Sequence, residues 1–320
     1  MAERGHGDGN VGDSRRPAVW NRGFVTYAVP ASRWSLARQA LGTATDRFRS
    51  LLAPGSNADA MATADWTVAD SAAHVLSIAL LYVGLVKDGA EMLRVPHLDE
   101  VLATTNVDTV ADLNDRVLAH FTERDPERIG VLLGDAVDVI LDATRDVPPE
   151  TTVRWLGDAR VTLAGLVAHL VNELLVHGWD MARALRRPWP IPDDQAALYW
   201  ELFFLGMLHH DYGALLNTSV PMPSRPIAVR FQSAYTPTAT IVLGHERVWL
   251  APPENPYDVR VTFRPARFNL LLFGRTATAT AVVRRDIVIG GPRPWRLPAF
   301  LRVVHMPNPK FAPSVARPRR

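Results

Sequence analysis

Apolar residues recur at helical spacing through most of the first 216 residues. Residues three or four positions apart lie on one face of a helix, so this spacing predicts amphipathic helices. The pattern predicts six helices, at about 31–53, 67–87, 108–123, 126–145, 162–185 and 193–216. Residues 29–216 are therefore expected to form an antiparallel helical bundle.

The start of the second helix carries a recognisable cap. The Thr67 hydroxyl can accept a hydrogen bond from the backbone N–H of Asp70, and the Asp70 carboxylate can reach back to Thr67, as in a capping box. Pro148 and Pro149 are expected to end the fourth helix, and Pro188 and Pro190 follow the fifth.

The pattern changes after Pro221 and Pro223. Short runs rich in β-branched and aromatic residues predict strands, and two less alternating stretches predict helices. The expected strands are 227–232, 238–243, 247–250, 258–263, 276–283 and 286–289, and the expected helices are 265–273 and 298–304. Residues 227–312 are thus predicted to form a small α+β domain after a linker at 217–226.

The two ends of the chain differ from the rest in composition. Residues 1–28 are predicted to be a flexible arm and residues 313–320 a flexible basic tail. The arm lacks the apolar core of a signal peptide. The longest apolar stretch, 72–86, is shorter than the roughly 20 residues that span a bilayer, so it predicts a buried core helix. We expect a cytoplasmic protein without a membrane partner, either a monomer or a homodimer.

Composition and charge exclude several classes of function. Apolar residues make up 48% of the 320 residues, which suits a sizeable core, and the net charge is only +2 at a pI near 9.1. No cluster of basic residues marks a nucleic-acid-binding face. There is no glycine-rich phosphate loop and no Gly-x-Ser-x-Gly nucleophile elbow. Because the chain has no cysteine, any thiol chemistry must use a thiol from outside the protein.

The most informative segment runs from His169 to Asp180. His169, Glu173 and His177 are spaced four apart, so they share one face of a helix that is apolar nearly all round. A buried carboxylate and buried imidazoles need partners, and one divalent metal ion would satisfy them together. The alternative is a hydrogen-bonded pair of Glu173 and His177 without a metal. His169 and Asp180 are candidates for orienting these ligands, or for purely structural positions.

His74 lies in the other very apolar helix, eight residues after Trp66. Helical bundles build metal sites from side chains on facing helices, so His74 can complete a site with Glu173 and His177. Three protein ligands leave positions open for water or substrate, as in catalytic zinc sites, although two histidines and a carboxylate also suit non-haem iron. A histidine held only by core packing is the alternative interpretation of His74.

Two motifs in this chain resemble those of a known family. Residues 66–74, Trp-Thr-Val-Ala-Asp-Ser-Ala-Ala-His, resemble the start of the second helix in DinB-like proteins. Residues 173–184, Glu-Leu-Leu-Val-His-Gly-Trp-Asp-Met-Ala-Arg-Ala, resemble the matching motif of the mycothiol-dependent maleylpyruvate isomerase branch. The resemblance covers roughly residues 30–215. The part around Asp258-Val-Arg-Val and Phe273-Gly274-Arg275 is similar, more loosely, to the sterol-carrier-like α+β domain of that branch.

The resemblance implies a DinB-like four-helix bundle that binds zinc, or a similar divalent ion, through His74, Glu173 and His177. It also implies a mycothiol-like thiol as cosubstrate, as in actinobacteria, and a small electrophilic substrate. A metal lowers the pKa of a thiol, and a thiolate can add to an electrophilic alkene, carbonyl or epoxide. Arg275 is the candidate for binding the cosubstrate or the substrate carboxylates. No catalytic residue is assigned beyond the metal ligands.

Three functions remain open at this point. The first is a metal-dependent thiol transferase or isomerase, which needs an open metal position beside a pocket. The second is a non-catalytic small-molecule or lipid-binding protein whose structural metal is closed by a fourth ligand such as His169. The third is a metal-dependent hydrolase, which needs a general base, for which the sequence offers only Asp180 or Glu201.

Overall fold

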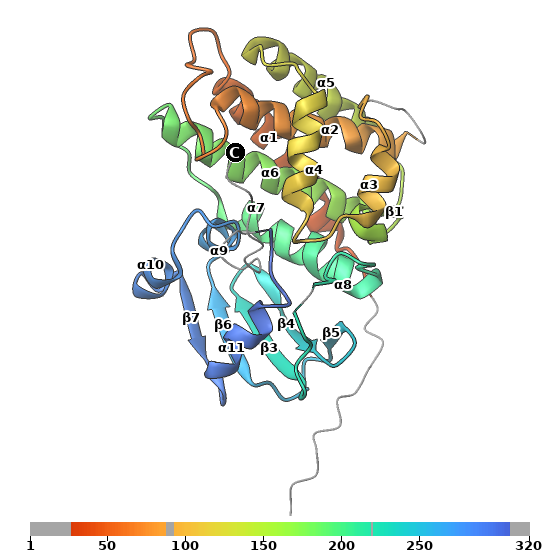
Figure 1. The fold of residues 1–320 in the computed structure, drawn as a ribbon, viewed down its shortest axis with the longest axis vertical. Helices are drawn as coiled ribbons and strands as arrows, with labels where there is room; N and C mark the ends of the chain where they lie inside the picture. Colours follow the sequence, from red (N-terminus) through yellow and green to blue (C-terminus); the bar gives the residue numbers. More distant parts are fainter. Residues whose placement is uncertain (1–26, 88–92, 219, 308–320) are drawn as a thin grey trace, which may run out of the picture.

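A computed structural model describes residues 27–87, 93–218 and 220–307 of the chain (Figure 1). A helical part lies above a smaller part built around a five-stranded sheet. Most of the predicted arm and all of the predicted basic tail lie outside the described residues. The predicted domain bounds and linker stay predictions, although the described helices of the upper part end at His210 and the sheet begins at Ile227.

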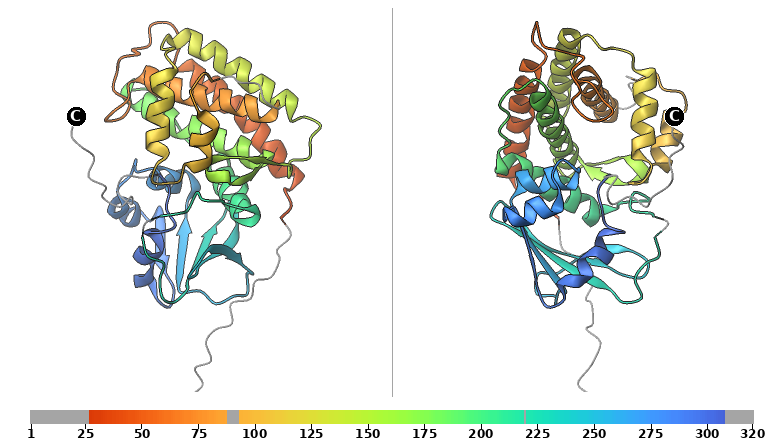
Figure 2. Two further views of the ribbon diagram at one scale, coloured as in Figure 1. Left: turned by 45° about the vertical axis from the view of Figure 1, so that its right-hand side comes forward. Right: turned by 60° about the vertical axis from the view of Figure 1, so that its left-hand side comes forward.

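The long helices α1, α2, α5 and α6 form the body of the helical part, which is seen from two sides in Figure 2. α6 packs along α1 and α2, and α5 packs against the same two helices from the other side. Their bounds are α1 Ala31–Ser50, α2 Val68–Val86, α5 Pro126–Ala143 and α6 Leu163–Ala184. All four occur where the apolar spacing predicts them, and the capping box of Thr67 and Asp70 is confirmed at the start of α2.

Helices α2 and α6 are the most deeply buried of the four. Nearly every residue of α6 is buried, in keeping with a helix that is apolar on all sides. Within the described residues, α2 is the one helix long and apolar enough to cross a membrane, but 67% of that stretch is buried inside the fold. The prediction of a core helix over 72–86 therefore agrees with the packing of α2.

A short helix, α3, and a two-stranded hairpin interrupt the predicted run of helices. α3 (Leu98–Thr104) and α4 (Val110–His120) lie between α2 and α5. β1 (Thr152–Arg154) pairs antiparallel with β2 (Arg160–Thr162) across the 3-10 turn η1 (Leu156–Asp158). The expectation that the first 216 residues are almost wholly helical is wrong for this hairpin and misses α3. Strands of three residues and a helix without a buried residue leave no periodic pattern to detect.

The predicted helix over 193–216 is shorter and less regular than expected. It consists of α7 (Asp193–Leu198), a π-helical stretch η2 (Tyr199–Leu205) and α8 (Gly206–His210). Asp211 leaves the helix in an extended conformation and bridges to Arg160 of β2. π-helical turns are rare and concentrate at functional sites, and η2 contributes aromatic side chains to the pocket described below.

The sheet of the lower part has the strand order β5-β4-β3-β6-β7. Only β3 and β6 run parallel; the other neighbours are antiparallel. The strands are β3 Ile227–Ser233, β4 Thr236–Leu243, β5 Val248–Ala251, β6 Val259–Phe263 and β7 Ile287–Gly290. The chain from β6 to β7 passes through helices α9 (Pro265–Leu272) and α10 (Thr278–Val283), and η3 (Pro294–Arg296) with α11 (Leu297–Leu301) follows β7. A mixed helix-and-sheet protein is therefore confirmed, whereas the DinB-like and sterol-carrier-like assignments stay predictions.

The predicted strand over 276–283 is wrong, because residues 278–283 form α10. The alternation of threonine and alanine there looks strand-like, but Ala281 is the only buried residue of α10. Alanine side chains are too small to fill one face of a sheet, so the alternation gives a strand no packing advantage.

One continuous apolar core joins the helical part to the sheet. Trp200 of η2 stacks on Phe204 within the helix and contacts Phe231 of β3 and Phe268 of α9 across the boundary. The aromatic contact fixes η2 and α9 on the sheet, beside the face of α6 that carries the candidate site.

Candidate functional site

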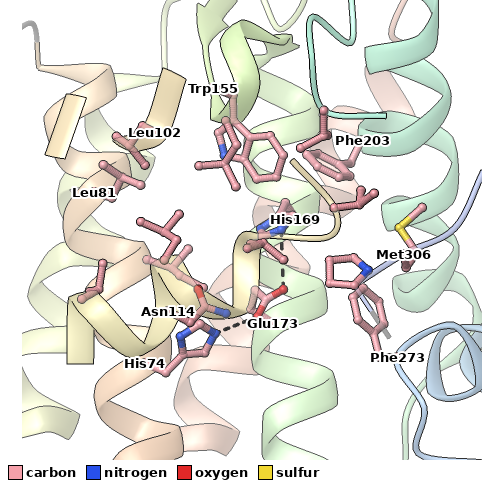
Figure 3. A pocket seen from close by; sticks show the side chains of 18 of the residues that line it. His74, Leu81, Leu102, Asn114, Trp155, His169, Glu173, Phe203, Phe273 and Met306 are labelled. Atoms are coloured by element: carbon pink, nitrogen blue, oxygen red, sulfur yellow. Dashed lines mark ion pairs between the residues drawn. The ribbon is translucent and has the colours of Figure 1, made fainter. Parts of the chain in front are cut away.

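The three predicted metal ligands come together between α2 and α6. Figure 3 shows His74 facing Glu173. His74 Nε2 lies 3.6 Å from Glu173 Oε2, and His177 Nε2 lies 3.3 Å from the same oxygen. One ligand atom from each residue lies within 4.8 Å of the other two. Glu173 and His177, four residues apart on α6, and His74 on the facing helix α2 therefore direct their ligand atoms to the same place.

The site is buried and holds a carboxylate that no lysine or arginine neutralises. Within the described residues, the ion-pair partners of Glu173 are three histidines. Burial lowers the pKa of His74, which keeps its imidazole neutral at neutral pH. Burial by itself would raise the pKa of Glu173, but the imidazoles of His177 and His74 hold that pKa well below its usual value. A buried carboxylate that lacks a lysine or arginine partner is a candidate for binding a cation.

The donor set fits a divalent metal ion. Two ligands about 2.0–2.1 Å from a tetrahedral zinc ion are roughly 3.3–3.4 Å apart, close to the two distances from the Glu173 oxygen. Neutral imidazole and ionised carboxylate are the protonation states that bind metals. The same three residues also suit iron, so the donor set indicates a divalent ion but does not distinguish zinc from iron.

His169 occupies a different position from the three converging residues. Its Nε2 lies 3.5 Å from the other carboxylate oxygen, Glu173 Oε1, and its Nδ1 hydrogen-bonds the hydroxyl of Tyr82 at 2.9 Å. Tyr82 in turn accepts a hydrogen bond from Trp155 Nε1. His169 is not one of the clustered ligand atoms. Its predicted role in orienting a ligand stays a prediction, but its place beside Glu173 is compatible with it.

Asp180 links His177 to Arg275 from the sheet part. Asp180 Oδ2 lies 3.6 Å from His177 Nδ1, a nitrogen that is buried without a hydrogen bond in the described part of the chain. Arg275 Nη2 donates to the same carboxylate at 2.6 Å and Nε donates at 3.1 Å. Arg275 was predicted to bind a cofactor; the structure shows that its guanidinium already binds a buried carboxylate.

Gly178 explains another part of the motif. A Cβ at Gly178 would lie 2.2 Å from a ring carbon of Trp189, so only glycine lets this indole pack on α6. Trp189 Nε1 donates to the carbonyl of Leu175, and Arg47 lies over the indole face. Gly178 of the motif and Trp189, which lies after it, therefore fix the backbone of α6 next to His177.

The site opens into a pocket of about 230 Å³ that is lined mainly by apolar and aromatic side chains (Figure 3). α2, α3 and α4 supply leucines and valines, η2 supplies Tyr199 and Phe203, and the sheet part supplies Phe273, Arg275 and Met306. The pocket thus lies between the helical part and the sheet part, with the three clustered ligands in its wall.

Comparison with known proteins gives a family resemblance for the helical part. Residues 38–182 match the family model described as the mycothiol maleylpyruvate isomerase N-terminal domain. The helical part is therefore similar to this domain family. Two solved structures of the mycothiol-dependent maleylpyruvate isomerase, one of them of a mutant, match 78–79% of this chain and 93–94% of their own at 14% identity and a TM-score of 0.44. No curated protein matches the chain.

The candidate ligands of this maleylpyruvate isomerase-type domain could be found from sequence, but its pocket could not. Asn114 and His305 line the pocket, yet neither has a neighbour at useful spacing in the sequence. His305 follows the last helix and lies 3.4 Å from Asp108, almost 200 residues earlier in the chain. Such positions depend on how the two parts of the molecule pack.

The two general bases considered for a hydrolase do not reach the pocket. Glu201 of η2 pairs with Arg33 of α1 at 2.5 Å, and neither Glu201 nor Asp180 lines the pocket. Since Asp180 is already bound by Arg275, neither of these two carboxylates is placed to act as a base beside the clustered ligands.

Proposed function

We propose that this protein is a divalent-metal-dependent thiol transferase or isomerase of the maleylpyruvate isomerase type. It uses a mycothiol-like thiol and a small electrophilic substrate, and it acts in the cytoplasm. The observation that carries the proposal is the convergence of His74, Glu173 and His177 at the wall of an apolar pocket, where Glu173 has no other cation. The family of the helical part supports the thiol.

Each residue of the site has a distinct part in this proposal. His74, Glu173 and His177 hold the ion, and three protein ligands leave a position open toward the pocket, as in catalytic sites. His169 keeps Glu173 in place while its own ring is fixed by Tyr82. Asp180 and Arg275 tie the end of α6 to the sheet part, next to His177.

A divalent ion in this position lowers the pKa of a bound thiol and so supplies a thiolate at neutral pH. The protein contributes the surroundings for that thiolate. The apolar lining of the pocket excludes water, which strengthens every electrostatic interaction inside it. The carboxylate of Glu173 offsets part of the charge of the ion without blocking the open side.

The test is the metal content of the untagged protein, measured by mass spectrometry for the wild type and His177→Ala. We expect about one zinc or similar ion per wild-type chain and a large loss in His177→Ala, because a ligand is removed. His209→Ala is the matched control, since His209 stacks on Tyr27 and does not line the pocket. A wild-type protein that stays metal-free in excess zinc would refute the proposal. Glu173 and His177 would then be a buried polar pair.

A further inference from the structure

The fixed charges around the pocket are few and already balanced. Arg275 is the only lysine or arginine among the described residues that line it, and its guanidinium is bound to Asp180, which is 2% exposed. Arg275 Nη1 also donates to the carbonyl of Phe273. Glu173 is the only acidic residue in the lining. The charges of a divalent ion, the Glu173 carboxylate and one thiolate would sum to zero.

A dicarboxylate would have to enter this pocket without counter-charges. Burying an ionised carboxylate away from water is strongly unfavourable unless a cation or several hydrogen-bond donors meet it. Three of the five N–H groups of Arg275 already donate to Asp180 and Phe273, so two remain for further acceptors, and the positive charge of the guanidinium is already balanced by Asp180. No second cation lines the described pocket.

The remaining lining suits an apolar ring. Trp155 and Phe203 pack edge to face, and Phe203 stacks on Tyr199, so aromatic faces and edges surround the space. The hydroxyl of Tyr199 is directed at the sulfur of Met306 and that of Tyr82 at His169, so these polar groups are engaged within the protein. An apolar cavity of about 150 Å³ holds benzene, and a pocket of about 230 Å³ has room for a ring with a short chain.

One neutral polar group remains available. Asn114 of α4 lines the same pocket as the three clustered ligands (Figure 3). Within the described residues its amide makes no hydrogen bond. A neutral amide can donate to a carbonyl oxygen, but it does not balance a charge.

We propose that the electrophile of this site is an apolar, ring-bearing molecule with a carbonyl group and at most one acid group, and not a small dicarboxylate such as maleylpyruvate. The inference rests on the proposed function for the reaction, but it concerns the pocket and can be tested by binding alone. Asn114 binds the carbonyl oxygen, and the leucine-rich wall of α2 and α3 holds the ring.

The experiment compares two unreactive probes by calorimetry on the full chain, loaded with zinc and saturated with mycothiol. 4-Phenyl-2-butanone represents the apolar ketone and succinate represents the dicarboxylate. We expect the ketone to bind at least tenfold more tightly than succinate. The same titrations without metal reveal any succinate binding that occurs on the ion alone. Succinate binding as tight as the ketone, or mutual exclusion of ketone and mycothiol, would overturn the inference.

Variants locate the binding. Leu81→Gln places a polar group in the pocket wall and should weaken ketone binding at least fivefold, whereas Val131→Gln, on the exposed side of α5, should leave it unchanged. Asn114→Leu should weaken binding of the ketone about fivefold but not that of ethylbenzene, which lacks the oxygen. Equal effects on both probes would refute the role of Asn114.

Failure of the proposed function is distinguishable from failure of this inference. If zinc or mycothiol does not bind, the proposed function fails, and the titrations of the metal-free protein still decide whether the pocket prefers the ketone. If both bind but succinate is preferred, the proposed function stands and the inference is wrong.

Discussion

Glu173 and Asp180 are two buried carboxylates on the same helix, two turns apart, and they are neutralised in different ways. Asp180 has an arginine from the sheet part, bound through two nitrogens. Glu173 has only imidazoles within reach. A carboxylate with its own arginine has a structural partner, whereas a buried carboxylate without a lysine or arginine partner among the described residues is a candidate for binding a metal ion. The contrast separates the candidate metal centre from the ion pair beside it.

The largest expected effect breaks the Asp180 pair. Arg275→Met leaves the Asp180 carboxylate buried without its cation, so we expect the free energy of unfolding to fall by about 3–5 kcal/mol in metal-free protein. Glu173→Gln in the same metal-free protein should cost less than Arg275→Met, because it leaves no buried charge behind, although it removes the interactions with His74 and His177 that lower the pKa of Glu173. Urea unfolding at pH 7 measures both.

The double variant Asp180→Asn/Arg275→Met is the control for Arg275→Met. The double variant should recover part of the lost stability, because the unpaired charge is gone. If Glu173→Gln destabilises metal-free protein as much as Arg275→Met does, the proposed difference between Glu173 and Asp180 is wrong. Glu173 would then be held by its histidines as a structural polar group, and the metal proposal would lose its main support.

The neighbours of Glu173 could be predicted from the sequence much better than the partner of Asp180. His169, Glu173 and His177 are neighbours on one helical face because of their spacing alone, and the apolar residues around them indicate burial. The partner of Asp180 lies 95 residues away on a segment after α9. No local pattern encodes that contact, so Arg275 could be singled out by its motif but not assigned its partner.

The same distinction holds for the fold. The long helices were predictable from the spacing of their apolar residues, and the strands β3, β4, β5, β6 and β7 were predictable from runs of β-branched and aromatic residues. α3 has no buried residue of its own, and α10 buries only Ala281. The conformation of these segments depends on what packs beside them. α3 contributes Leu98 and Leu102 to the pocket, and the chain after the last helix contributes His305, Met306 and Pro307, so this part of the lining could not be predicted.

Gly178 lies between Glu173 and Asp180 on α6 and packs against Trp189. Gly178→Ala measures how much this packing, rather than charge, contributes to stability. Alanine normally stabilises a helix by about 1 kcal/mol relative to glycine. Here its Cβ would overlap the Trp189 ring, so we expect a net loss of about 2 kcal/mol in the free energy of unfolding. Gly42→Ala in α1 is the matched control, because nothing lies within 4 Å of its Cβ, and it should gain about 0.5–1 kcal/mol. Equal signs for the two variants would contradict the close contact of Trp189.

Asp70 extends the comparison to a half-buried carboxylate that has both a cation and backbone donors. Partial burial raises its pKa, but hydrogen bonds from Thr67 and Arg124 outweigh this and hold the pKa below its usual value. A carboxylate with a depressed pKa stabilises the fold above its unfolded pKa, near 3.9, and that contribution is lost as the pH falls through the folded pKa. Asp70→Asn should therefore lower the free energy of unfolding by about 1 kcal/mol at pH 7, and this difference from wild type should shrink below about pH 4.

Urea unfolding at several pH values tests this, with the exposed Asp65→Asn as a control that shows no such difference. A difference that stays constant down to pH 3 would show that Asp70 acts through shape and not through charge.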